Sequence, residues 1–107
     1  EVDTADNPVS INNISSDIKG FELFQNYPNP FNPFTKIVYN LNSNVQSNVK
    51  LSVFDILGNE VVTLVNEKQN AGRHEIHLDG SGLSSGIYFY KLTAGKYSDT
   101  KKLILLK

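Results

Sequence analysis

The chain has 107 residues, of which 39% are hydrophobic and 20% charged, and its formal net charge is −1. This length and apolar content suit a single domain with a modest core, and the balanced charge gives no reason to expect a nucleic-acid partner. No apolar run approaches the roughly 20 residues of a membrane helix, so we expect no transmembrane segment, and the lack of cysteine excludes disulfides.

Residues 1–20 are rich in Asn, Ser and Asp and show no apolar period. Such a composition predicts a flexible polar linker over 1–20, with a folded domain from 21 to 107. The chain begins with Glu1 and carries no signal peptide. We therefore expect that a longer protein precedes the linker and that any export signal lies there.

Residues 25–36, QNYPNPFNPFTK, hold three of the four prolines. Proline cannot donate to a sheet ladder, so this stretch predicts an extended segment along a sheet edge that prevents pairing with another chain. We expect its aromatic rings to pack against the core. Its match to a PxxP ligand, from Pro30 to Pro33, abuts a strand, and we interpret it as structural.

Short runs rich in Val, Ile, Tyr, Phe and Thr follow, separated by Gly, Asn and Ser. They predict strands at 21–25, 35–41, 48–56, 61–65, 73–79, 87–93 and 97–106. The regular spacing and the lack of a helical period predict an all-β fold, an immunoglobulin-like antiparallel β-sandwich of about seven strands. We expect these residues to point inward: Ile37, Tyr39, Leu41, Val49, Leu51, Val53, Val62, Leu64, Ile76, Leu78, Tyr88, Tyr90 and Leu92.

Two local motifs support the sandwich. In LSSGIYFY, Gly86 precedes Tyr88 by two residues, which suits the tyrosine corner of immunoglobulin-like folds, where the hydroxyl bonds to an upstream backbone carbonyl. Tyr90 then occupies the place of the second cysteine of an antibody domain, so an aromatic side chain replaces the disulfide between the sheets. In DILG, Asp55 and Gly58 predict a tight turn that the carboxylate stabilises.

Signals for catalysis are weak. His74 and His77 are three residues apart on a predicted strand, so they point to opposite faces. His77 shares its face with Glu75 and Asp79, which we interpret as a solvated polar surface rather than a metal site. We therefore expect no enzyme activity and no cofactor.

Three stretches, LFQNYPNPFNPFTKIVYNL, KLSVFDILGNEVVTLVN and the segment from residue 71 to 107, resemble in order and spacing the C-terminal sorting domain of the type IX secretion system. The resemblance covers about residues 21–107 and includes the opening Pro28-Asn29-Pro30. The same elements are similar to the immunoglobulin-like module of flagellar hook-capping proteins. Phe34 departs from the family, which usually has Ser or Thr there, and adds a ring that is either exposed or packed.

The resemblance implies a non-catalytic secretion signal from the Bacteroidetes and related bacteria. It implies that an upstream cargo protein in the same chain crosses the periplasm and outer membrane and becomes secreted or attached to the cell surface. The implied partners are the translocon and an outer-membrane shuttle or surface peptidase. Removal of the domain would fall within residues 1–20.

The last strand, TKKLILLK, contains four consecutive apolar residues, which cannot all face one side. Either both faces are buried, or one face is left for a partner. The alternative function of its lysines is to protect a sheet edge. With the resemblance, we expect a receptor contact made by these residues: Lys101, Lys102, Leu103, Leu105 and Lys107.

A second hypothesis is an adhesive or carbohydrate-binding sandwich appended to a secreted enzyme. Sugar-binding modules usually present a platform of aromatic rings, often tryptophan, on one sheet face. The chain has no tryptophan, and its candidate rings, Phe54, Phe89 and Tyr97, are scattered in the sequence. A hook-cap-like structural module would lie inside a chain rather than at its end.

Overall fold

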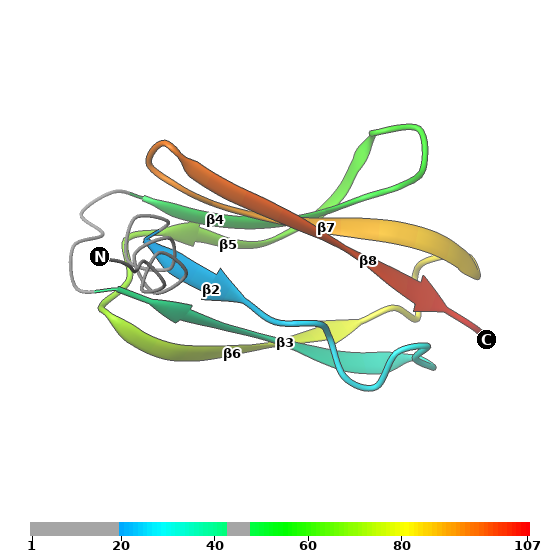
Figure 1. Cartoon of the computed structure of the whole chain (residues 1–107). Helices are drawn as coiled ribbons and strands as arrows, with labels where there is room; N and C mark the ends of the chain where they lie inside the picture. Colours follow the sequence, from blue (N-terminus) through cyan, green and yellow to red (C-terminus); the bar gives the residue numbers. More distant parts are fainter. Residues whose placement is uncertain (1–19, 43–47) are drawn as a thin grey trace, which may run out of the picture.

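The computed structural model describes residues 20–42 and 48–107. This part of the chain is all-β and contains no helix, as predicted, and each predicted run forms a strand (Figure 1). The bounds differ from the predicted ones by a few residues. The strands are β2 (Phe21–Leu23), β3 (Phe34–Leu41), β4 (Val49–Phe54), β5 (Glu60–Glu67), β6 (Gly72–Asp79), β7 (Gly86–Ala94) and β8 (Tyr97–Leu105).

The strands form two antiparallel sheets that pack face to face as a sandwich (Figure 1). One sheet has the order β2-β3-β6 and the other the order β5-β4-β7-β8. The first, second and fifth strands thus oppose the remaining four. Immunoglobulin-like domains likewise set their first, second and fifth strands against the third, sixth and seventh, and here the fourth strand joins the latter sheet. The predicted fold class is therefore confirmed.

Along each strand, inward residues alternate with outward ones, and the inward residues of the two sheets meet to form the core between them. Most of the predicted inward set is buried, whereas Val62, Leu64 and Ile76 are only partly buried against it. Six further core residues lie outside the predicted inward set: Phe21, Leu23, Val65, Ala94, Leu103 and Leu105.

Both predicted tyrosine features are present. The Tyr88 hydroxyl donates a hydrogen bond of 2.7 Å to the Ser84 carbonyl, which is the tyrosine corner. The Tyr90 hydroxyl crosses to the other sheet, where it donates to the Phe24 carbonyl and accepts from the Asn26 backbone amide. Tyr90 therefore joins the two sheets by hydrogen bonds at the place where a disulfide joins them in antibody domains.

The proline-rich segment, residues 25–33, crosses from one sheet to the other. Its first part forms a bridge from Tyr27 to Lys36 of β3, and its later part forms a parallel bridge from Phe31 to Leu105 of β8. Phe31 is buried as expected. The expected packing is wrong for Tyr27, which is 74% exposed, and the ring of Phe34 is also exposed, at 62%.

The predicted linker lies almost wholly outside the described residues. At its end, Gly20 is buried, and its carbonyl accepts a hydrogen bond of 2.9 Å from the Asn42 amide. Gly20 is therefore part of the folded domain, and the linker over the preceding residues stays a prediction.

Candidate partner-binding surface at the C-terminal strand

Strand β8 is the last strand of the four-stranded sheet, with β7 as its sheet partner. Leu103 and Leu105 lie opposite Tyr88 and Gly86 of β7 and have no exposed surface. Both leucines point into the core. This face of the strand holds the sandwich together and is closed to a partner while β8 stays in the sheet.

The other face of β8 is turned away from the core. Ile104 on this face is half-buried, and Leu106, just beyond the strand, is 56% exposed. The sequence left open whether both faces of the run Leu103–Leu106 are buried or whether one face is free. The structure shows the second arrangement, with one face buried in the core and the other turned outward. We call the side of the four-stranded sheet that is turned away from the core its outer face.

The proline-rich segment covers the free backbone edge of β8 near its end. The Phe31 amide donates to the Ile104 carbonyl at 2.9 Å, and the Phe31 carbonyl accepts from the Leu106 amide at 3.0 Å. The Asn29 side-chain oxygen accepts from the Ile104 amide at 3.0 Å. Gln25 adds a side-chain hydrogen bond of 2.7 Å to the Lys102 carbonyl. Two segments that lie far apart in the sequence thus hold each other in place.

The three lysines predicted to bind a receptor do not converge on one face. Lys102 is exposed on the outer face opposite Phe89, whereas Lys101 lies opposite Tyr90 and is half-buried. Lys107 is exposed, and its ammonium group donates to the Ser81 carbonyl at 2.7 Å. Lys102 is therefore the lysine of this set that the structure leaves most available on the outer face.

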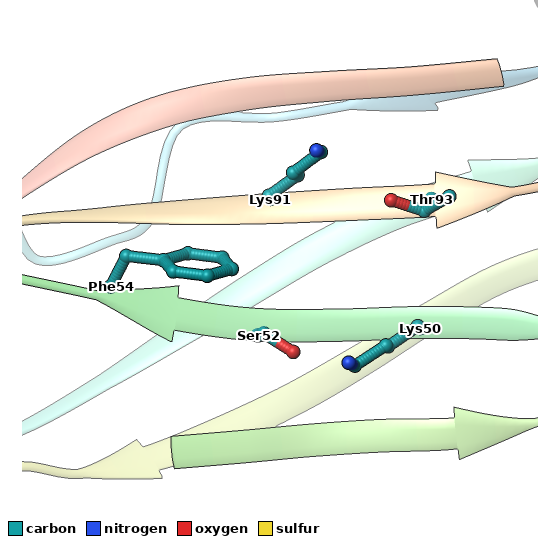
Figure 2. Close-up of a pocket in the computed structure, with 5 residues that line it drawn as sticks. All are labelled: Lys50, Ser52, Phe54, Lys91 and Thr93. Carbon is teal, nitrogen blue, oxygen red and sulfur yellow. The ribbon is translucent and has the colours of Figure 1, made fainter. Parts of the chain in front are cut away.

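The outer face has a shallow depression between β4 and β7, which sequence reasoning did not find. Its volume is about 100 Å³, and Figure 2 shows its side chains standing on these two strands. The lining residues are Lys50, Ser52, Phe54, Lys91 and Thr93. The periodicity of the strands marks each of them as outward, but only the pairing of β4 with β7 brings them together.

The sequence matches the family described as the secretion system C-terminal sorting domain over residues 25–106. The chain belongs to this family. No curated protein matches the sequence. The matched region starts in the proline-rich segment and ends beside β8, so its two ends are neighbours in space.

A sorting domain of this family is a C-terminal secretion signal of the type IX system, which confirms the predicted function. It directs an attached cargo across the outer membrane to a secreted or cell-surface location and thereby interacts with the type IX machinery. The family is not known as catalytic. None of the described residues belongs to a helix long and apolar enough to cross a bilayer.

The aromatic rings named for the carbohydrate-binding hypothesis do not form one platform in the sorting domain. Phe54 and Phe89 are scattered in the sequence but lie opposite each other on β4 and β7. Tyr97 lies opposite Ala94 and packs partly against the core. Phe54 and Phe89 are thus half-buried on the outer face, whereas Tyr97 lies on the inner side. The three rings share no face, so they do not support the carbohydrate-binding hypothesis.

The two histidines point to opposite sides of β6, as predicted. His74 stacks on Tyr39, with ring centroids 5.3 Å apart, whereas His77 is exposed and its ring lies 3.3 Å from Glu75. The Lys36 ammonium, 3.8 Å from Glu75, holds the pKa of that carboxyl below its usual range. Within residues 20–42 and 48–107, no cluster of three acidic, His or Cys side chains could hold a metal ion.

Two exposed aromatics, Tyr27 of the proline-rich segment and Phe34 at the start of β3, lie on the opposite side of the sorting domain, over the three-stranded sheet. Tyr27 and Phe34 flank an open pocket of about 290 Å³. The other lining residues are Pro28, Thr35, Lys36 and His77. Thr35 donates a hydrogen bond of 2.8 Å to the Pro28 carbonyl, which fixes the segment against β3.

Proposed function

We propose that the type IX machinery recognises the C-terminal strand in place, on the folded sorting domain. The observation that carries this proposal is the burial of Leu103 and Leu105, which have no exposed surface, beneath an edge held by the proline-rich segment. In this proposal the contact residues are Lys101, Lys102 and Lys107. Their charge steers the domain toward an acidic receptor.

We assign Leu103 and Leu105 to holding the strand, whereas the sequence analysis placed them in the receptor contact. Removing a leucine side chain from a core and exposing it costs about 1.5–3 kcal/mol. The hydrogen bonds from Phe31 and Asn29 would also have to break. Recognition of the three lysine side chains, none of which is fully buried, requires neither change, so it is the less costly route.

The proposal also includes the specific partners and the processing of the domain. The translocon and an outer-membrane shuttle bind the folded, non-catalytic domain, and a surface peptidase cuts within residues 1–20. The polar composition of that segment supports access for a peptidase. The buried position of Gly20 supports a cut on its N-terminal side.

A reporter fusion tests the proposal. Deleting residues 101–107 is a poor test, because it removes Leu103 and Leu105 from the core. Instead, residues 1–107 are fused to a periplasmic reporter in a bacterium with the type IX system, and Lys101, Lys102 and Lys107 are all changed to Glu. The control changes Lys68, Arg73 and Lys96 to Glu, which alters the net charge equally.

We expect the control to be displayed or released as the unchanged fusion is, and the Lys101, Lys102 and Lys107 variant to stay in the periplasm. Thermal unfolding of both purified variants shows whether each is folded. Export of the folded variant at the level of the control would show that these lysines are not read. Retention of the unchanged fusion in the periplasm would contradict the sorting function itself.

A further inference from the structure

The turn between β4 and β5 exposes two aliphatic side chains. Ile56 is 69% exposed. Leu57 is 82% exposed, which is the highest value for any large hydrophobic residue in the described part of the chain. In Figure 1 this hairpin rises from the end of the four-stranded sheet, at the upper right. We call Ile56 and Leu57 the apolar tip.

A dense set of hydrogen bonds fixes the apolar tip. One oxygen of the Asp55 carboxylate accepts from the Leu57 amide at 2.9 Å and from the Asn59 amide at 3.0 Å. The Asp55 backbone also bonds to Gly58 and Asn59. Gly58 has a φ of +89°, which glycine adopts without strain. The tip is therefore held in one conformation before any partner arrives.

Folding does not account for the apolar character of the tip. The carboxylate of Asp55 and the glycine at 58 set the turn, and the two positions between them accept most residue types. Neither Ile56 nor Leu57 belongs to the buried core. The two exposed side chains are adjacent and directly follow the outward Phe54, and grouped apolar side chains of this kind can mark a binding surface, whereas single ones are ordinary.

The apolar tip lies at the same end of the sheet as the proposed receptor contact. Phe54 of β4 lies opposite Phe89 of β7, which in turn lies opposite Lys102 of β8. These three outward residues form one row across the outer face, and the tip follows directly after Phe54. A single partner can therefore cover the end of β8 and the tip together.

We propose that Ile56 and Leu57 insert into an aliphatic pocket with a basic rim on a protein of the type IX machinery, as a second contact beside β8. This inference rests on the proposed function. The charge at the tip favours such a rim, because the Asp55 carboxylate lies in the turn and residues 51–60 contain no Lys or Arg. Glu60 is paired with Lys50 at 3.4 Å, so within the described residues Asp55 carries the unpaired charge beside the tip. The same carboxylate would be repelled by an anionic lipid surface.

The rigid turn suits this role. Binding by a mobile loop loses part of its free energy to ordering, whereas a fixed tip avoids most of that loss. Each aliphatic side chain that a partner buries completely strengthens binding about tenfold or more. The tip then acts as an anchor whose truncation weakens binding while leaving the fold unchanged.

The test changes Ile56 and Leu57 to Ser in the reporter fusion, and the matched control changes Tyr27 and Phe34 to Ser. The control residues are also exposed aromatics, at 74% and 62%, but lie over the other sheet, where they flank the same open pocket. We expect both purified variants to melt at the temperature of the unchanged domain. We expect export to fall at least tenfold for the tip variant and to stay unchanged for the control.

Export of the tip variant at the unchanged level would overturn the inference and leave the β8 contact standing. Retention of the unchanged fusion would defeat the proposed function and this inference together. A second variant, Leu57→Asp, places a charge on the tip and should lose export as well. Flotation of the purified domain with phosphatidylethanolamine and phosphatidylglycerol vesicles checks the partner class, because binding that the tip variant loses would point to lipid and contradict a protein pocket.

Discussion

The Tyr90 hydroxyl accepts a hydrogen bond of 2.8 Å from the backbone amide of Asn26, which belongs to the segment that follows β2 in the other sheet. The same hydroxyl donates to the Phe24 carbonyl at 2.7 Å. Tyr90 is fully buried, so both backbone groups are satisfied away from bulk water. One side chain thus ties the proline-rich segment to the sheet that contains β8.

Replacing Tyr90 with Phe should destabilise the domain by about 1–3 kcal/mol, because the Asn26 amide and the Phe24 carbonyl would lose a buried partner. Urea unfolding measures the change. Tyr97→Phe is the control, since Tyr97 is half-buried and its hydroxyl has no hydrogen bond within the described residues. Equal stability of the two variants would show that the link between the sheets contributes nothing measurable.

The same tyrosine should make stability fall in alkali. Burial raises the pKa of Tyr90 from 10.0 to about 12. The folded state therefore holds the proton more tightly than the unfolded state, and its stabilising effect, complete below pH 10, is lost as pH rises toward 12. Burial raises the pKa of Tyr39 similarly, but that effect is common to wild type and Tyr90→Phe. The gap in urea midpoint between these two proteins should narrow over this range, and a constant gap would contradict the assignment.

Gly80 should be intolerant of a side chain. A Cβ there would lie 3.0 Å from the Phe31 ring and 3.2 Å from Leu105, at the contact between the proline-rich segment and β8. We expect Gly80→Ala to cost about 1–3 kcal/mol through overpacking. Gly82→Ala is the control, because a Cβ at that position meets nothing within 4 Å. Differential scanning calorimetry should show a lower melting temperature for Gly80→Ala than for Gly82→Ala.

The Asp55 turn should weaken in acid. The hydrogen bonds from Asn59 and from the Leu57 and Gly58 backbone hold the pKa of Asp55 below its usual value of 3.8. The carboxylate therefore stabilises the fold fully above pH 3.8, and this effect is lost as pH falls through the lowered pKa. Asp55→Ala should be less stable than wild type at neutral pH, and the difference in urea midpoint should shrink in acid. A difference that is independent of pH would contradict a role for the ionised group.

The period-two patterns predicted the strands, the fold class and most of the core, because alternation records directly which face of a strand is buried. Tyr88 and Asp55 were also predictable, since their hydrogen bonds are local in sequence. The contact of Phe31 with Leu105 was not, because it joins residues far apart and no local pattern records it. The same limit explains why the row from Phe54 to Lys102 was missed.

The misplaced aromatics have a different cause. Tyr27 lies in a segment whose prolines interrupt the period of two, so alternation gives no guide to its direction. Phe34 follows the alternation of β3, in which Thr35 and Ile37 are buried, and is therefore outward. Leu103 and Leu105 were placed in a partner contact because four apolar residues in a row do not reveal which face is inward. Pairing with β7 decides this, and it turns Ile104 outward.

The most direct test of recognition in place is to lock β8 into its sheet. Ile87 lies opposite Ile104, and the Ile104 amide and carbonyl bond to Asn29 and Phe31 rather than to β7. The pair is therefore of the closely spaced kind, with Cα atoms about 4.5 Å apart, which suits a disulfide. The chain has no other cysteine to compete.

The measurement is the amount of reporter at the cell surface for a fusion with Ile87→Cys and Ile104→Cys, oxidised in the periplasm, against Ile87→Ser and Ile104→Ser. Under the proposal that the strand is read while it remains in the sheet, we predict that the locked fusion is exported as well as the serine control. Retention of the locked fusion in the periplasm, relieved when the disulfide is reduced, would show that β8 must leave the sheet and would contradict the account.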